Sequence, residues 1–267
     1  MHQTFGTSLK HWRNQRGLSQ LALSMEADIS SKHVSFLESG RSLPSREMVL
    51  HLGHVLEIPL AQQNVMLVQA GFSHAYSRMS FEDPKMAAVK HALEVMLNNH
   101  QPYPAMVFDW QWNIVLANET QKKLDALFKQ HVPNFSTSHN IMERLFDPNG
   151  YRPFIKNWHQ VASVMFARVK KEHSMFPDRQ SNLLETLVAF GDIPTDWKEN
   201  HFEMSEPMIG IDIEIGGVEL SLFSTLAQFG TAADVTMQEL IIEQYFPANE
   251  STKLFFESLD SSNEYRV

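Results

Sequence analysis

The stretch GLSQLALSMEADISSKHVSFLESGRSLPS, residues 17–45, carries the start and stop signals of two short helices. Ser19 and Ser30 favour helix N-caps, because a serine side chain accepts a hydrogen bond from a free amide of the first turn. Gly40 is a good stop for the second helix, since glycine readily adopts the left-handed conformation that ends helices. The spacing predicts two helices joined by a tight turn.

The second of these helices has two different faces. Val34 and Leu37 are three residues apart and share one side of a helix, which we expect to be buried. Ser31, Lys32 and Ser35 then point outward as a group. A short helix with a small polar outer face is the shape that enters the major groove of DNA.

The flanking sequence extends the helical pattern over residues 1–72. Apolar residues at helical spacing predict further helices over residues 7–15, from residue 45 to 56 and from residue 60 to 70. The periodicity is then lost, and Ser, Asp and Pro predict a linker over residues 73–85. We therefore expect a first, all-α domain of five helices.

Residues 5–60 resemble the Cro/cI-type helix-turn-helix repressors, also called the XRE family, through the strings GLSQ, ISSKHVSFLESG and R-x-x-PS. The resemblance implies DNA binding, with Arg13 and Glu38 as a structural ion pair. Asp28 stands where the family usually has glycine in the turn, but Asp tolerates the left-handed conformation better than most residues. The implied DNA contacts are Gln20 and Arg41 with phosphates, Ser31, Lys32 and Ser35 with base edges, and Phe36 with a thymine methyl group unless it packs into the core.

Charge is divided unevenly along the chain, which has 267 residues and a net charge of −9. Residues 1–80 hold seven Lys and Arg against five Asp and Glu, a net charge of +2, so the remaining residues carry −11. Only the first part can approach a phosphate backbone without repulsion. One recognition helix reads only a few base pairs, so we expect a homodimer on a double-stranded DNA operator.

The pattern changes from helical to alternating in PYPAMVFDWQWNIVLAN, residues 102–118. Two apolar runs, residues 105–108 and 114–117, flank a turn and predict a hairpin. Asn118 is a good cap for a following helix. Farther on, a long helix is expected over residues 154–172 and a short one over 182–190, and alternation on both sides of Gly216 and Gly217 predicts a second hairpin. Strands before and after helices predict an α+β domain with one antiparallel sheet.

The whole chain resembles helix-turn-helix regulators with an MmyB-like, PAS-like ligand-binding domain. The strings that carry this resemblance are PYPAMVFDWQWNIVLAN, RPFIKNWHQVA and SLFSTLAQFGTAADVTMQELIIEQYFPANEST. It implies a multidomain protein with the PAS-like domain at residues 86–267. It also implies a transcription factor with an apolar cavity for a small apolar ligand, of which a fatty acid is an example.

Flexible and aromatic side chains of this second domain are candidates for the cavity wall, although such residues also build ordinary cores. The candidates are Phe108, Trp110, Trp158, Met165, Phe223 and Phe229. Arg152 and Asn157 lie where the long helix is expected to start, so they are candidates for binding an acyl carboxylate, or for local capping.

The segment GTAADVTMQELIIEQYFPANEST, residues 230–252, allows two readings. Thr236 and Glu239 have the spacing of a capping box, which predicts a helix, but the residues that follow alternate enough for a last strand. Phe246 and Pro247 end either element. We expect this segment to close the cavity or to lie at a subunit contact.

The sequence does not favour an enzyme. Histidines beyond residue 80 show no metal-ligand spacing, no nucleophile elbow or phosphate-binding loop occurs, and there is no cysteine, so no catalytic residue, metal or cofactor is expected. Two alternatives remain: a ligand-free protein-interaction module, or a redox or haem sensor with His100, His159 or His173 as an axial ligand. No leader and no run of about 18 apolar residues is present, so a cytoplasmic location without membrane insertion is expected.

Overall fold

The computed structural model describes residues 4–175, 181–194, 210–230 and 232–261. The chain forms two compact units, and the division is not a single cut in the sequence. Met1–Met86 and Phe229–Gln238 make up the first unit, whereas Ala87–Gln228 and Glu239–Val267 make up the second. A short piece from late in the chain therefore belongs to the N-terminal unit.

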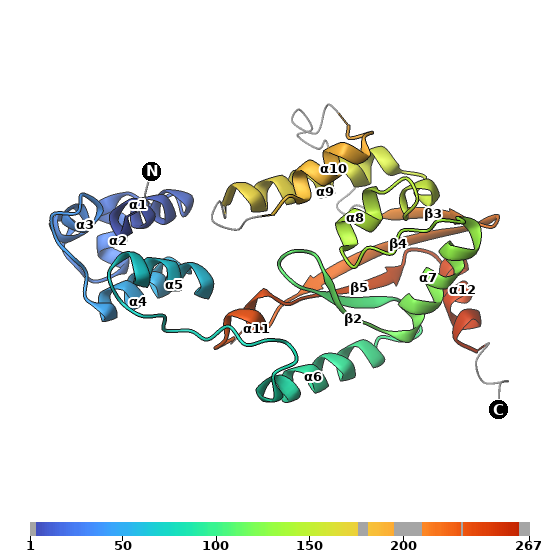
Figure 1. Cartoon of the computed structure of the whole chain (residues 1–267), viewed down its shortest axis with the longest axis horizontal. Helices are drawn as coiled ribbons and strands as arrows, with labels where there is room; N and C mark the ends of the chain where they lie inside the picture. Colours follow the sequence, from blue (N-terminus) through green and yellow to red (C-terminus); the bar gives the residue numbers. More distant parts are fainter. Residues whose placement is uncertain (1–3, 176–180, 195–209, 231, 262–267) are drawn as a thin grey trace. The chain divides into compact units, whose positions relative to one another are not determined.

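The first unit contains the five expected helices (Figure 1). They are α1 (Phe5–Gln15), α2 (Gln20–Glu26), α3 (Ser31–Glu38), α4 (Arg46–Val55) and α5 (Leu60–Gln69). Ser19, Ser30 and Ser45 cap α2, α3 and α4 by accepting hydrogen bonds from backbone amides of the first turn, as the sequence predicts for the first two. Apolar residues from all five helices, among them Leu9, Leu23, Val34, Leu52 and Leu67, are completely buried and form the core.

The turn between α2 and α3 has the backbone conformation expected for it. Asp28 has a φ of 49°, in the left-handed region that favours glycine. The aspartate therefore allows the chain to reverse direction where the family usually has glycine, and α3 begins two residues after Ile29.

The second unit is an α+β domain built on five antiparallel strands in the order β2-β1-β5-β4-β3. The strands are β1 (Ala105–Phe108), β2 (Ile114–Ala117), β3 (Ile211–Ile215), β4 (Val218–Ala227) and β5 (Ile241–Pro247). Both expected hairpins are present, with Gly216 and Gly217 at positive φ in the β3–β4 turn. The expected fold class, a five-helix unit followed by an α+β unit, is confirmed.

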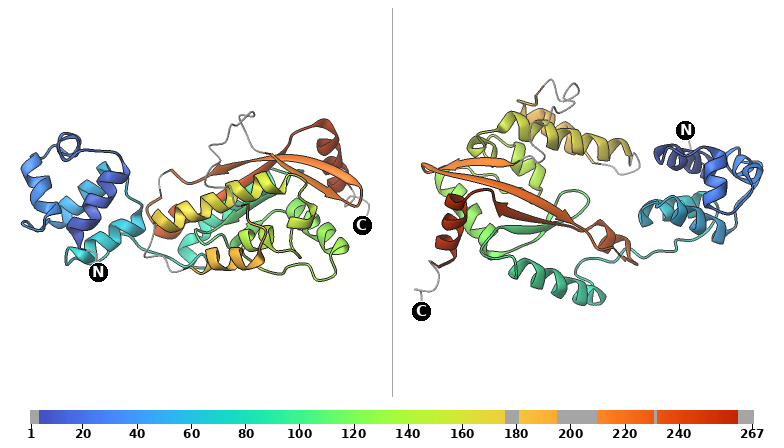
Figure 2. Two further views of the ribbon diagram at one scale, coloured as in Figure 1. Left: turned by 90° about the horizontal axis from the view of Figure 1, so that it is seen from above. Right: turned by 180° about the vertical axis from the view of Figure 1, so that it is seen from behind.

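Six helices accompany this sheet, and all but α6 contribute side chains to its main core (Figure 2). They are α6 (Ala87–Asn98), α7 (Glu119–His131), α8 (Ile141–Phe146), α9 (Trp158–Met175), α10 (Leu183–Phe190) and α12 (Glu250–Ser261), with 3-10 turns η1 (Pro84–Met86, in the first unit) and η2 (Arg152–Phe154). Asn118 caps α7 as expected, through Gln121 N. The local sequence patterns did not indicate α8 or α12. None of the helices in the described ranges is long and apolar enough to cross a membrane.

The segment after β4 contains both elements that the sequence left open. A short helix, α11 (Val235–Glu239), is followed directly by β5. The predicted cap at Thr236 is wrong, because Asp234 Oδ1 accepts the hydrogen bonds from Thr236 N and Met237 N, while the Thr236 hydroxyl donates to Met79 O. Aspartate at this position leaves the threonine hydroxyl free to bind another part of the chain.

Candidate functional site

Helix α3 presents the polar face that the sequence predicts. Val34 and Leu37 are 0% and 1% exposed, which fixes the inner side of the helix. On the outer side Ser31 and Lys32 are exposed and Ser35 is half-buried. The three groups are therefore accessible together on one short helix, the arrangement needed for contact with base edges. Their DNA contacts stay a prediction.

The ring of Phe36 contacts two cations. Lys32 Nζ is 5.5 Å from the centroid of the ring and the guanidinium carbon of Arg41 is 5.7 Å from it. Such distances give an attractive cation–π contact. The half-buried ring thus holds two of the predicted DNA-contacting charges near one another, which is compatible with an additional contact to a thymine methyl group.

A buried ion pair joins α1 to the end of α3. Arg13 Nε and a terminal nitrogen donate to the two oxygens of Glu38 at 2.6 and 3.0 Å, so the expected ion pair is confirmed. Gln20 Nε2 donates to the same carboxylate at 2.8 Å. The side-chain amide predicted to bind a phosphate therefore already has a protein partner, and it connects the start of α2 to this pair.

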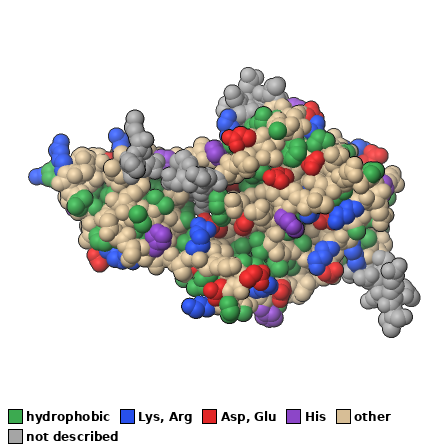
Figure 3. All heavy atoms as spheres, viewed as in Figure 1, with side chains coloured by type: hydrophobic (Ala, Val, Ile, Leu, Met, Phe, Trp, Pro, Cys, Tyr) green, Lys and Arg blue, Asp and Glu red, His purple; other side chains and the backbone are tan. Residues whose placement is uncertain are grey.

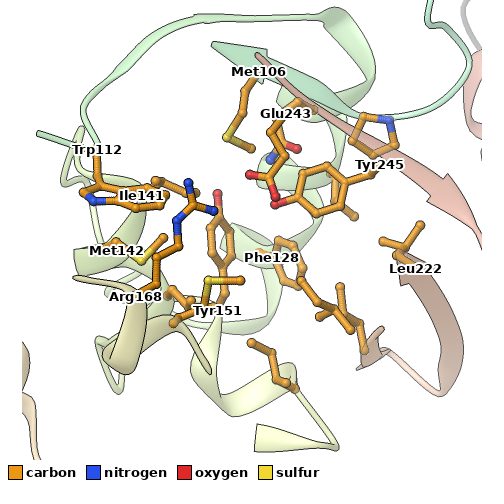
Figure 4. A pocket seen from close by; sticks show the side chains of 18 residues that line it. Met106, Trp112, Phe128, Ile141, Met142, Tyr151, Arg168, Leu222, Glu243 and Tyr245 are labelled. Atoms are coloured by element: carbon orange, nitrogen blue, oxygen red, sulfur yellow. The ribbon is translucent and has the colours of Figure 1, made fainter. Parts of the chain in front are cut away.

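The second unit contains a cavity of about 70 Å³, partly open to solvent, between the sheet and the helices α7, α8 and α9 (Figure 4). Most of its wall is apolar. The lining side chains are Pro104, Met106, Trp112, Gln121, Leu124, Phe128, Ile141, Met142, Leu145, Tyr151, Ile155, Met165, Arg168, Ile211, Ile213, Leu222, Glu243 and Tyr245. Three of them are methionines, whose unbranched side chains adapt easily to the shape of a ligand.

Polar groups gather at one region of this wall. In Figure 4 the guanidinium of Arg168 and the carboxyl group of Glu243 both point toward the middle of the cavity, and the Tyr245 hydroxyl lies beside Glu243. Burial raises the pKa of Glu243, against the opposing effects of its hydrogen bonds with Ser224 and Tyr245 and of the charge on Arg168. A raised pKa favours the neutral form of Glu243, and this form can donate a hydrogen bond as well as accept one. We call Arg168, Glu243 and Tyr245 the polar end of the cavity.

Glu172 and Trp112 hold the side chain of Arg168 at the polar end in place. Arg168 Nε donates to Glu172 Oε1 at 3.2 Å, and the guanidinium carbon is 4.6 Å from the ring centroid of Trp112. Trp112 Nε1 donates to the other oxygen of Glu172 at 3.1 Å. Within the described residues the terminal nitrogens of Arg168 donate no hydrogen bond to the protein. They are therefore available to an acceptor in the cavity.

A second polar network supports the wall from α7 and α8. Asp125 accepts hydrogen bonds from the Tyr151 hydroxyl at 2.7 Å and from Gln121 Nε2 at 2.9 Å, and it pairs with Arg144 at 3.0 Å. Burial, followed by the charge of Asp125, raises the pKa of Tyr151. Because these groups satisfy one another, they fix the wall and leave ligand recognition to the polar end.

Most of the predicted ligand-binding residues lie away from this cavity. Met165 lines the cavity, whereas the other seven candidates lie elsewhere. The aromatic candidates pack on other rings or lie outside the lining: Phe108 stacks on Trp112, Trp158 packs on Phe146, Phe223 stacks on Phe246, Trp110 is half-buried outside the lining, and Phe229 belongs to the first unit. Arg152 pairs with Asp192, and the Asn157 side chain donates to Gly210 O and accepts from Asp212 N. Arg152 and Asn157 are thus used in local structure. These seven residues do not line the cavity, and their contact with a ligand stays a prediction.

The sequence contained a signal for the residues that were missed. Glu243 and Tyr245 are two apart in an apolar strand and so share a face, and a carboxylate in such a strand is unusual. Arg168 follows Met165 by three residues, which places both on one face of α9.

Among the described residues, no group of three or more His, Asp or Glu side chains is placed to hold a metal ion.

The charges seen on the molecular surface are mixed. On the face shown in Figure 3, acidic side chains lie among Lys and Arg rather than in one patch.

Comparisons with known proteins give two family matches and similar solved structures. Residues 89–259 match the family described as the MmyB-like transcription regulator ligand binding domain, and residues 9–63 match the helix-turn-helix family. Among solved structures, the PAS domain from Bordetella pertussis BvgS is similar over 66% of this chain and 98% of its own, at 13% identity and a TM-score of 0.29. An RNA-binding light-oxygen-voltage receptor is similar over 98% of this chain and 68% of its own, at 10% identity and a TM-score of 0.28. No curated protein matches the chain.

The match to the ligand-binding domain spans more than half of the chain, and the cavity lies within it. The match to the helix-turn-helix family contains α2 and α3, with the polar face of α3. With a helix-turn-helix unit followed by this domain, the chain belongs to the family of MmyB-like transcription regulators.

Proposed function

We propose that this protein binds a specific operator as a homodimer and that a small apolar ligand in its second unit, of the fatty acid class, changes its affinity for that operator. The cavity carries this proposal, because a concave and mostly apolar wall with a few convergent polar groups is typical of a small-molecule site. A cytoplasmic location is part of this proposal, since the protein must reach its DNA target.

The size of the cavity sets a condition on the ligand. A volume of about 70 Å³ is small beside the roughly 300–1,000 Å³ of common ligand pockets. An alkyl chain therefore fits only after side chains move, and Met106, Met142 and Met165 are the lining residues with the freedom to do so. We propose that the chain of the ligand lies among these methionines with its acid group at the polar end.

Mass spectrometry of a solvent extract of the folded protein tests the proposed ligand class. We expect a retained aliphatic acid, and we expect added lauric acid to change the fluorescence of Trp112 in the cavity wall and the affinity for operator DNA selected from random duplexes. A protein that yields no small molecule and whose fluorescence and DNA affinity are unchanged by lauric acid contradicts the proposal.

Substitution of Lys32 with alanine tests the reading of bases by α3. Lys32 is exposed beside Ser31 and Ser35, so its loss is expected to reduce the preference for the operator by about 1 kcal/mol while binding to random DNA changes little. Arg41→Ala is the matched comparison, because loss of a phosphate contact weakens binding to both DNAs alike and lowers the salt dependence. Equal losses on both DNAs for Lys32→Ala contradict a base-reading role. Electrophoretic mobility shifts at several salt concentrations measure these effects.

A further inference from the structure

The connection between β4 and β5 is much longer than the pairing of these strands requires. Leu226 pairs with Glu243 and Ala227 with Ile242, so the two strands are immediate antiparallel neighbours. Neighbouring strands are commonly joined by about two to five residues. Here the chain leaves the sheet after β4, and Phe229–Gln238 belongs to the first unit before the chain returns to begin β5.

We call residues 229–238 the excursion. Specific hydrogen bonds fix it within the first unit. Asp234 is 7% exposed, and its Oδ2 accepts from Ser77 Oγ at 2.7 Å and from Met79 N at 3.2 Å. Val235 N donates to Ser77 O at 2.9 Å, and the Thr236 hydroxyl donates to Met79 O at 2.6 Å. Side-chain and backbone groups of both segments are therefore paired, which is more than a chance surface contact provides.

A further bond joins the excursion to the start of α5. Pro59 precedes α5 and has no side-chain oxygen, so the helix has no cap of its own. Gln238 Oε1 accepts from Leu60 N at 2.7 Å. A free amide at a helix N-terminus is normally satisfied by a neighbouring Ser, Thr, Asp or Asn. In this protein the acceptor comes from a residue far along the chain, next to β5.

The partner segment is itself attached to α5. Asn64 Nδ2 donates to Tyr76 O at 2.8 Å, and its Oδ1 accepts from Ala75 N and Tyr76 N at 3.0 and 3.1 Å. Residues 75–79 therefore follow α5, and α5 packs against α1 and α4. A shift of the excursion reaches the helical core of the first unit through groups that are already hydrogen-bonded.

The two strands at the ends of the excursion both face the cavity. Leu222 of β4 and Glu243 and Tyr245 of β5 line it. Glu243 is five residues after Gln238, and the intervening Leu240 and Ile242 are buried, so the connection is short and firmly held. A ligand at the polar end that displaces these side chains therefore also shifts the backbone of β4 and β5, which continues directly into the excursion.

We propose that residues 229–238 couple the two functions: occupancy of the cavity shifts β4 and β5 and thereby changes the docking of this excursion on Leu60, Ser77 and Met79. The proposal rests on the proposed function, since it supplies the route by which a ligand alters DNA binding. It goes further in assigning that route to Asp234, Thr236 and Gln238. A ligand can bias an equilibrium only through different contacts in two states, and the docked and released excursion are those two states.

A pair of double variants isolates these contacts. Thr236→Val with Gln238→Met removes the donor to Met79 O and the acceptor for Leu60 N with little change in shape, whereas Thr236→Ser with Gln238→Glu keeps both. In the full chain we expect the first variant to bind lauric acid and DNA each within about twofold of the wild type. The effect of lauric acid on DNA affinity is expected to fall to none, and the matched control is expected to keep the wild-type effect.

Amide hydrogen exchange followed by mass spectrometry gives the second measurement. We expect lauric acid to change exchange at residues 77–79 and at the start of α5 in the wild type but not in the Thr236→Val, Gln238→Met variant. Met165→Phe enlarges a side chain that α9 contributes to the cavity and so partly fills the cavity without a ligand. This variant is expected to change exchange at the same residues as lauric acid does in the wild type. If lauric acid leaves the operator affinity of the wild type unchanged, the proposed function fails. The coupling proposal is then tested by the amide hydrogen exchange of residues 77–79 and the start of α5 alone. Retention of the full ligand effect in the Val/Met variant, or unchanged exchange on filling the cavity, overturns the coupling proposal.

Discussion

Replacement of Glu38 with alanine is expected to destabilise the helix-turn-helix unit by about 3–5 kcal/mol. The side chains of Arg13 and Glu38 are only 9% and 4% exposed, so removal of the carboxylate leaves a buried guanidinium without its counter-ion. Arg13 keeps hydrogen bonds to Asn14 and to Leu18 O, but neither partner carries a charge. Since small domains have total stabilities of about 5–15 kcal/mol, such a loss is enough to abolish DNA binding at moderate temperature.

An exposed ion pair in the same unit provides the matched control. Arg16 and Glu57 are 3.7 Å apart with 41% and 83% of their side chains exposed, and exposed pairs contribute about 0–1 kcal/mol. Glu57→Gln is therefore expected to leave stability almost unchanged. Amide exchange in α1 and α3 of the full chain measures both variants. A Glu38→Ala protein as stable as Glu57→Gln shows that the buried pair contributes nothing beyond its packing.

The same pair predicts an acid-sensitive unit. Burial acts to raise the pKa of Glu38, but the hydrogen bonds from Arg13 and Gln20 and the charge of Arg13 outweigh it, so the pKa lies below its ordinary value of 4.5. A carboxylate with a lowered pKa in the folded state stabilises the fold above its unfolded pKa. This contribution begins to fall below about pH 4.5 and is lost as the pH drops through the lower folded value.

Local sequence signals predicted most elements of both units because these signals are themselves local. The serines before α2, α3 and α4, the aspartate in the α2–α3 turn and the two glycines between alternating runs act through neighbouring residues only. The exposure of Ser31 and Lys32 followed in the same way from the burial of Val34 and Leu37. Such signals survive in any tertiary context that buries the same face.

The cavity was less predictable because its wall is assembled from strands and helices far apart in the sequence. Aromatic character does not distinguish Phe108, which is buried beneath the wall, from Phe128, which is part of it. The excursion at 229–238 was missed for a related reason. Its cap at Asp234 is a local feature, but its partners Ser77 and Leu60 are some 160 to 180 residues away, and no short-range pattern indicates them.

Replacement of Arg168 with methionine is expected to weaken binding of lauric acid by about 1.5–3 kcal/mol, roughly 10- to 150-fold. The expectation follows from the polar end of the cavity, where the terminal nitrogens of Arg168 are the groups placed to donate charged hydrogen bonds to an acid. Methionine keeps much of the length of the side chain and its packing on Trp112. Binding of 1-dodecanol, which has the same alkyl chain without the charge, is expected to change little.

Glu172→Gln separates the charge of Arg168 from its support. This variant removes the ion pair at 3.2 Å while leaving the guanidinium in place, so lauric acid binding is expected to be kept or strengthened. Isothermal titration calorimetry with both ligands measures the two variants. Equal losses of lauric acid and 1-dodecanol affinity for Arg168→Met mean that the arginine acts by packing and that the acid group lies elsewhere.

The pH dependence of ligand binding then follows from Glu243, which lies with Arg168 at the polar end of the cavity. Burial raises its pKa, so at lower pH the neutral carboxyl group donates a hydrogen bond to the ligand's carboxylate, and at higher pH the ionised group repels it. Affinity for lauric acid is therefore expected to decrease as the pH rises through the pKa of Glu243, while affinity for 1-dodecanol does not. Glu243→Gln is neutral at every pH and should abolish the decrease. A decrease of the same size in this variant assigns the titration to another group, and the acid then does not lie between Arg168 and Glu243.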